Sequence, residues 1–146
     1  MIRLGEVRKV LSANDLGLTG SHQAGIAIPK DRNILSFFPP LDSMEYNPDC
    51  ILTVATPQTG HLWDLRFVYY NSKLHGQGTR NEYRLTGTTR MLRELSASVG
   101  DLIRFRRSQF GDIDVTVQER YGPILSPPTE RILSNGWRMT ISDPED

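Results

Sequence analysis

The sequence predicts a mostly β domain with two short helices, folded as a barrel or a partly open barrel. Segments rich in β-branched and aromatic residues recur at short spacing, and each is bounded by Gly, Pro, Asp or Asn. Helical patterns are brief and occur twice. No internal repeat or low-complexity linker divides the 146 residues, so we expect residues 1–146 to form a single domain around one core.

Seven segments have the pattern of strands. In chain order they are residues 26–28, 50–56, 61–70, 82–86, 101–108, 112–118 and 136–142. Alternating apolar residues on both sides of Gln109-Phe110-Gly111 predict a hairpin whose alternate side chains face a core. Strand or helix periodicity also places five aromatic residues in or near that core: Phe37, Phe38, Trp63, Tyr69 and Trp137.

Two segments have helical patterns. Residues 30–39 follow Pro29, and residues 89–96 follow the hydroxyl pair Thr88-Thr89, where a threonine can cap the first turn. We expect a turn at residues 126–130 and a frayed tail at residues 143–146.

Composition limits the class of protein. No apolar run is long enough to span a bilayer, and the N-terminus is charged where a signal peptide needs an apolar segment. We therefore expect a soluble, intracellular protein. The single cysteine, Cys50, cannot form an internal disulfide, and it precedes an apolar run. We interpret it as a small core residue.

Charge is unevenly distributed although the formal net charge is zero. Residues 66–107 contain nine basic and three acidic side chains, and residues 31–65 and 108–146 contain the compensating negative charge. This surplus is compatible with a solvated face or with a nucleic-acid site, and charge alone does not separate the two.

Common catalytic signatures are absent from the sequence. The glycine-rich segment 17–30 lacks the Gly-Lys-Ser/Thr of a phosphate loop, and Ser21 directly follows Gly20, unlike a nucleophile elbow. Pro48-Asp49 lacks the acidic-x-Lys triplet of a metal-dependent nuclease, because Val7, Ile28 and Asn71 precede the three lysines by two residues. We therefore expect no catalytic residue, metal site or cofactor in this chain.

Two polar, glycine-rich segments have the composition of a groove reader. In YYNSKLHGQGTRNEYRL (69–85), Gly76-Gln77-Gly78 precedes consecutive Arg, Asn and Glu. Arg can fork onto guanine, Asn can pair with adenine, and Glu can accept from the cytosine amine. Alone, such a segment is more often a solvated turn. GLTGSHQAGIAIPK (17–30) adds a second segment with His-Gln chemistry, which favours recognition.

These motifs resemble the N-terminal effector DNA-binding domain of the EcoRII-type restriction endonucleases. The resemblance is carried by LSAND (11–15), TGSHQAGIAIPK (19–30), NP (47–48) and YYNSKLHGQGTRNEYR (69–84), in the family's order and spacing. It implies an open seven-stranded pseudobarrel, as in plant auxin-response-type transcription factors, with two arms that clasp double-stranded DNA from the major groove. It also implies a CCWGG-type site, and a nuclease domain, with its Mg²⁺, in a longer chain. A restriction enzyme would lie in the cytoplasm of a bacterium or archaeon. We expect the isolated domain to be monomeric.

The resemblance and the side-chain chemistry together suggest the site residues. The candidates for base reading are His22, Gln23, Arg80, Asn81, Glu82 and Arg84. Alternation would place Arg80, Glu82 and Arg84 on one face, where Glu82 could instead orient an arginine through an ion pair. The candidates for backbone contact are Lys9, Ser21, Lys30, Asn71, Ser72, Lys73 and Thr79.

Two other functions remain open from the residues alone. A single-stranded nucleic-acid binder of the oligonucleotide-barrel type would need exposed stacking aromatics, whereas the polar arms contain only Tyr83. A β-barrel module that binds a sugar or peptide would also account for the strands and the neutral charge.

Overall fold

The structure, a computed structural model, describes residues 5–19, 25–119, 130–132 and 136–141. Within these residues the strands are β1 (Gly5–Val10), β2 (Ile26–Ile28), β3 (Asp49–Thr56), β4 (His61–Tyr70), β5 (Glu82–Thr86), β6 (Leu102–Arg107), β7 (Ile113–Gln118), β8 (Glu130–Ile132) and β9 (Trp137–Ile141). The helices are α1 (Arg32–Leu35) and α2 (Thr89–Glu94). No helix in this part of the chain has both the length and the apolar character needed to span a bilayer.

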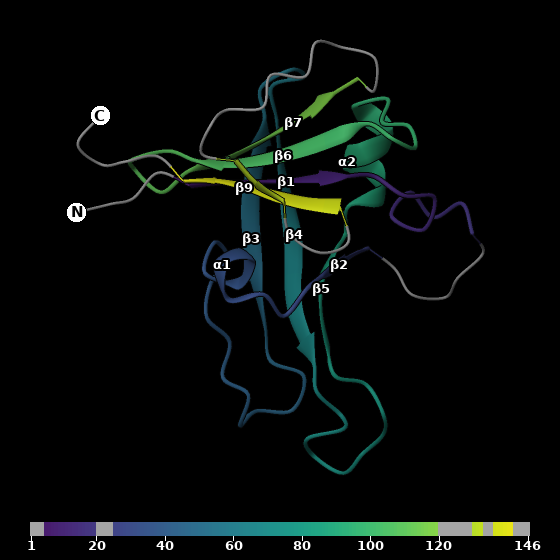
Figure 1. The fold of residues 1–146 in the computed structure, drawn as a ribbon, viewed down its shortest axis with the longest axis vertical. Helices are drawn as coiled ribbons and strands as arrows, with labels where there is room; N and C mark the ends of the chain where they lie inside the picture. The colour runs from purple at the N-terminus through teal and green to yellow at the C-terminus, as the bar shows by residue number, and fades with distance from the viewer. Residues whose placement is uncertain (1–4, 20–24, 120–129, 133–135, 142–146) are drawn as a thin grey trace.

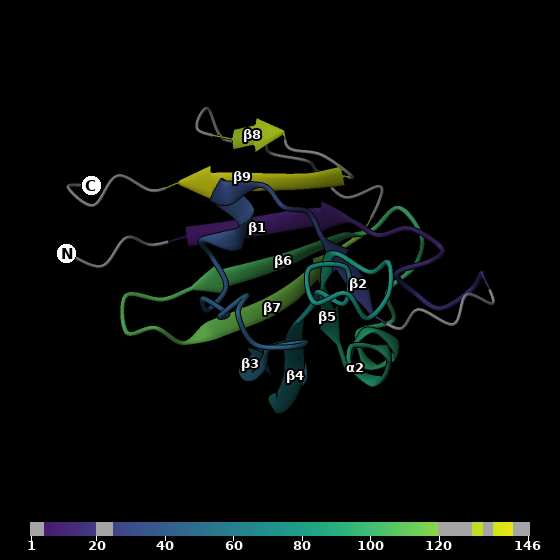
Figure 2. The ribbon, with the colours of Figure 1, turned by 90° about the horizontal axis from the view of Figure 1, so that it is seen from below.

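The strands form a single open sheet in the order β2-β5-β4-β3-β7-β6-β1-β9-β8. Neighbouring strands are antiparallel except β3 and β7, a parallel pair that joins two antiparallel groups through the register Val54↔Ile113 and Ala55↔Asp114. In Figure 1 the strands of one group run across those of the other. Figure 2 shows β8, β9, β1, β6 and β7 following one another as a curled layer.

The curled sheet encloses one hydrophobic core. Ile34 of α1 and Met91 and Leu92 of α2 are buried in it together with inward side chains of the strands. The Trp137 indole Nε1 donates to the carbonyl of Ala27 at 3.3 Å, which joins β9 to the edge strand β2. This bond connects regions far apart in the strand order, so the molecule is a half-barrel whose ends approach each other. This fits the pseudobarrel predicted from the sequence.

The seven predicted strands are all present, with boundaries that differ by at most one residue. The sheet contains two further strands, β1 and β8. The prediction missed β1 because three of its six residues, Glu6, Arg8 and Lys9, are charged. Arg8 and Lys9 are nevertheless buried, and Arg8 pairs with Glu6 at 3.3 Å. Paired charges can occupy positions that their composition alone would assign to solvent.

Both predicted helices are present, but the predicted threonine cap is wrong for Thr88. Thr88 is the residue before α2, its backbone is helical (φ −89°, ψ −15°), and its hydroxyl makes no capping bond. A capping side chain normally needs an extended backbone at that position. Asp31 has that geometry before α1, and its carboxylate accepts from the Asn33 amide at 2.8 Å.

The other fold predictions are confirmed where the structure describes them. Residues 102–107 and 113–118 form the expected antiparallel hairpin. Phe37, Phe38, Tyr69 and Trp137 are buried and Trp63 packs against the core. Cys50 also packs there, and burial raises the pKa of its thiol. The predicted turn continues into β8 at Glu130, whereas residues 126–129 and the tail 143–146 lie outside the described residues.

Candidate nucleic-acid interface

Two loops connect strands of the sheet at the positions of the two polar, glycine-rich segments. The first arm, residues 11–25, connects β1 to β2, and the second arm, residues 71–81, connects β4 to β5. Figure 1 shows the second arm extending past the ends of β4 and β5 and the first arm leaving from the end of β1. Since β2 pairs with β5, the exit of the first arm lies beside the strand that follows the second arm.

The first arm begins with a turn built from the LSAND motif. The Ser12 amide donates to the Asp15 carboxylate at 2.9 Å, and the Asp15 amide donates to the Ser12 hydroxyl at 3.2 Å. The Lys9 ammonium reaches the same carboxylate at 2.5 Å, and Lys9 is 5% exposed. In this structure Lys9 therefore holds the base of the first arm through this ion pair.

The second arm begins at a buried asparagine. Asn71 and Asn47 exchange two hydrogen bonds, each from the amide of one residue to the side-chain oxygen of the other, at 2.8 and 3.1 Å. The Asn71 carboxamide also donates to the carbonyls of Ser43 and Glu45. Asn47 has φ +48°, a conformation that asparagine tolerates. Asn71 and the NP motif thus hold loop 42–48 against the arm.

Ser72 holds together the two ends of the second arm, which we call its neck. Its hydroxyl accepts from the Arg80 amide at 3.0 Å, and the Lys73 amide donates to the Arg80 carbonyl at 2.9 Å. Gly78 lies so close that a Cβ there would be 2.9 Å from the Ser72 hydroxyl. Ser72 is also buried, so its position favours a structural role over a phosphate contact.

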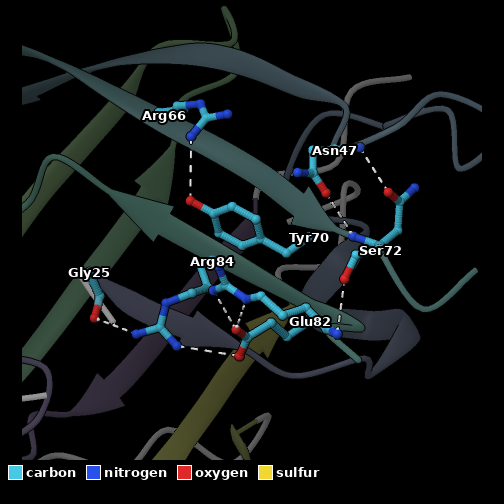
Figure 3. A network of polar contacts seen from close by, with 9 residues as sticks. Gly25, Asn47, Arg66, Tyr70, Ser72, Glu82 and Arg84 are labelled. Carbon is cyan, nitrogen blue, oxygen red and sulfur yellow. Dashed lines mark hydrogen bonds and ion pairs between the residues drawn. The ribbon is translucent and has the colours of Figure 1, made fainter. Parts of the chain in front are cut away.

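Arg80 lies where the second arm joins β5, and two neighbours orient it. Its Nε and Nη2 donate to Glu82 Oε1 at 3.0 and 2.6 Å, and its guanidinium lies 3.6 Å from the centre of the Tyr70 ring. The side chains of Arg80 and Glu82 are 40% and 30% exposed. The expected ion pair between Glu82 and an arginine is therefore present (Figure 3).

Arg84 is on the same face but buried. Its Nη1 donates to Glu82 Oε2 at 3.5 Å, its Nη2 donates to the Gly25 carbonyl at 3.1 Å, and its side chain is 3% exposed. The predicted alternation of Arg80, Glu82 and Arg84 is thus confirmed by their contacts. Burial leaves Arg84 without the exposed fork that base contact requires.

Two stacked tyrosine rings lie next to this network, and one of them binds Asn81. The Tyr69 hydroxyl donates to the Asn81 side-chain oxygen at 2.5 Å. The Tyr69 and Tyr83 rings stack at 4.1 Å, and burial together with Tyr69 raises the pKa of Tyr83. Because these rings stack on each other, they do not form the exposed platform that a single-stranded binder needs.

The remaining candidates differ in position. Lys30, Lys73 and Thr79 are exposed, and the Lys30 ammonium lies 5.9 Å from the centre of the Tyr69 ring. Ser21, His22 and Gln23 lie outside the described residues. No group of side chains suited to hold a metal ion occurs in the part of the chain that the structure describes.

The sequence analysis missed the support beneath Arg80. The Tyr70 hydroxyl accepts from Arg66 Nη1 at 3.4 Å, and Arg66 Nε donates to Asp49 at 2.6 Å. This hydrogen bond raises the pKa of the Arg66 guanidinium. The doublet Tyr69-Tyr70 carried the signal, because alternation directs one ring inward and the other outward.

Comparison with known proteins identifies the family of the chain. The family described as "Restriction endonuclease EcoRII, N-terminal" matches residues 6–121, a span that contains both arms. The chain belongs to this family. The type II restriction enzyme EcoRII of Escherichia coli is 40% identical to this chain over 84 residues. The match covers 53% of this chain and 19% of that protein. The chain therefore corresponds to a small part of that relative's length.

Proposed function

We propose that this chain binds double-stranded DNA sequence-specifically through the major groove, at a CCWGG-type site. It would act as the effector, or target-recognition, domain of a type II (IIE-like) restriction endonuclease. Membership of the EcoRII N-terminal family supports this proposal. The observation that carries it is the orientation of Arg80 by Glu82 and Tyr70 at the neck of a projecting arm.

The hydrogen bonds of Arg80 leave its guanine-binding edge available. Glu82 engages the side edge formed by Nε and Nη2, and Tyr70 covers one face. No hydrogen bond among the described residues engages Nη1, so the end edge formed by Nη1 and Nη2 can fork onto guanine O6 and N7. Glu82 Oε1 is next to this edge and could accept from a neighbouring cytosine N4. A C·G pair presents both partners.

The other candidates divide into contact and support. We propose phosphate contacts for the exposed Lys30, Lys73 and Thr79 and for Ser21, with His22 and Gln23 as the base contacts of the first arm. For the residues that the structure buries or engages, we propose that they shape the arms: Lys9, Asn71, Ser72, Asn81 and Arg84.

Catalysis would belong to another part of a longer chain. We propose that these 146 residues act as a monomeric binding module without a cofactor, and that a nuclease domain in the same longer chain uses Mg²⁺. The match to a small share of the E. coli enzyme supports this division.

Binding to three DNA probes tests the proposal. Fluorescence anisotropy at several salt concentrations would compare a CCWGG duplex, a duplex with the site scrambled and the corresponding single strand, with a DNA-free sample as the blank. We expect tightest binding to the CCWGG duplex, weaker and strongly salt-dependent binding to the scrambled duplex, and the weakest to the single strand. Equal affinity for both duplexes would contradict sequence-specific recognition, and preference for the single strand would favour the oligonucleotide-barrel alternative.

A further inference from the structure

Arg84 lies between the two arms and contacts both sides of the interface. Its buried guanidinium reaches Glu82, the partner of Arg80, and the carbonyl of Gly25, the last residue of the first arm (Figure 3). Hydrogen bonds from a guanidinium are directional because the group is planar. The position of Gly25 is therefore tied to the position of Glu82.

The Gly25 end of this connection is closely packed. Gly25 has φ +84°, and a Cβ there would be 2.2 Å from the Leu85 carbonyl. The next residues pair with β5 in the register Ile26↔Leu85 and Ala27↔Arg84. The exit of the first arm is thus wedged against β5, so a displacement of the Arg84 side chain acts directly on the arm's backbone.

The Glu82 end is shared. Oε1 accepts from Arg80 at 3.0 and 2.6 Å, whereas Oε2 accepts from Arg84 at 3.5 Å. One carboxylate therefore holds two guanidinium groups. When Arg80 or Glu82 adjusts to a base, the balance between these two interactions changes, and Arg84 transmits the change to Gly25.

We propose that Arg84 is a positioning residue that makes DNA contacts of the two arms energetically interdependent. This inference rests on the proposed function, because it assigns how the arms of that same site cooperate. Without Arg84, each arm would contribute to binding independently. With it, loss of a contact in one arm weakens the contribution of the other.

A double-mutant cycle measured in two backgrounds tests this role. Gln23→Ala, Arg80→Ala and the double variant would be compared for dissociation constant on the CCWGG duplex, first with Arg84 present and then with Arg84→Gln. We expect non-additivity of about fivefold or more with Arg84 and additivity within about twofold in the Arg84→Gln background. Equal non-additivity in both backgrounds, or additivity with Arg84 present, would overturn the proposal.

Two controls separate positioning from folding. Arg84→Lys keeps the charge but replaces the fork by a single ammonium, so it should fold as the wild type does and still reduce the coupling. It replaces Arg84→Gln if melting shows that variant to be unfolded. Arg104→Gln removes an ion-paired arginine of β6, whose partner is Glu6, and should leave the coupling unchanged.

If the wild type fails to discriminate between the duplexes, the proposed function fails rather than this inference.

Discussion

At the scale of single residues, Arg80 combines exposure with orientation. The ring of Tyr70 and the carboxylate of Glu82 restrict its guanidinium before any DNA is bound. A restricted side chain loses less conformational entropy on binding than a free one. We therefore expect Arg80 to contribute to discrimination between sequences and not merely to affinity.

Replacing Arg80 tests that expectation. Arg80→Ala should weaken binding to the CCWGG duplex by about 1–3 kcal/mol and barely alter binding to a scrambled duplex. Lys73→Ala is the matched control, because Lys73 is an exposed cation of the same arm. It should weaken both complexes similarly and reduce the salt slope by about one. Equal losses on both duplexes for Arg80→Ala would reassign Arg80 to the DNA backbone.

Asn71 is a polar residue of the second arm with a structural role. Its side chain accepts from the Asn47 amide and donates to two carbonyls, and it is fully buried. Asn71→Ala removes these three hydrogen bonds from a buried position, so the free energy of unfolding should fall by about 2 kcal/mol. Chemical denaturation measures the loss. Unchanged stability with weaker DNA binding would instead support the phosphate contact suggested by the sequence.

At the scale of elements, the first arm depends on the backbone at its exit. Gly25 and Gly17 both have positive φ, +84° and +73°, but a Cβ meets nothing within 4 Å at Gly17 and lies 2.2 Å from a carbonyl at Gly25. Gly17→Ala should therefore cost about 1 kcal/mol from the dihedral angle alone. Gly25→Ala adds the steric conflict, so its melting temperature and its CCWGG binding should both fall further. Similar effects of the two changes would show that the close approach is unimportant.

The attachment of α2 to β4 should depend on pH. The hydrogen bond with His61, at 2.6 Å, is the main cause that lowers the pKa of Glu94. A carboxyl whose pKa is lower in the folded than in the unfolded state stabilises the fold above the unfolded value of about 4.3, and this contribution disappears as pH falls through the folded value.

Melting curves of a neutral variant check this dependence. Glu94→Gln should melt below the wild type at pH 6, and the difference should disappear near pH 3. Glu119→Gln removes an exposed carboxyl after β7 and should show no such difference at either pH. A gap for Glu94→Gln that persists at pH 3 would mean that packing, and not charge, attaches the helix.

At the scale of the whole molecule, we expect the chain alone not to cut DNA. The sequence lacks the acidic-x-Lys triplet of a metal-dependent nuclease, and the E. coli enzyme extends far beyond the matched region. Purified protein incubated with Mg²⁺ and a plasmid that carries CCWGG sites should leave the plasmid supercoiled, whereas a restriction enzyme for that site should linearise it. Site-specific cleavage by the pure chain would refute the division of labour proposed here.

Sequence reasoning was most successful for strands that are marked by local signals, namely the alternation of apolar residues and the turn residues at each end. Strands such as β4 and β7 have apolar alternation between turn residues, and their bounds followed directly. It missed β1 and the hydrogen-bond partners of Lys9 and Asn71, because composition does not show whether a polar group has a partner elsewhere in the fold. Asp15 lies six residues from Lys9, and Asn47 lies 24 residues from Asn71. Such pairings are properties of the tertiary structure.

The indole-to-carbonyl bond between Trp137 and Ala27 also bears on how the chain is made. It joins residues 110 positions apart, and β1 finds its partners in β6 and β9, which are synthesised much later. Such distant pairing slows folding, because the chain loses the entropy of loop closure before the stabilising contacts form. On the ribosome the first arm is translated early yet acquires its fixed exit late. In a longer polypeptide, this domain would therefore complete its fold only after its own last strand had emerged.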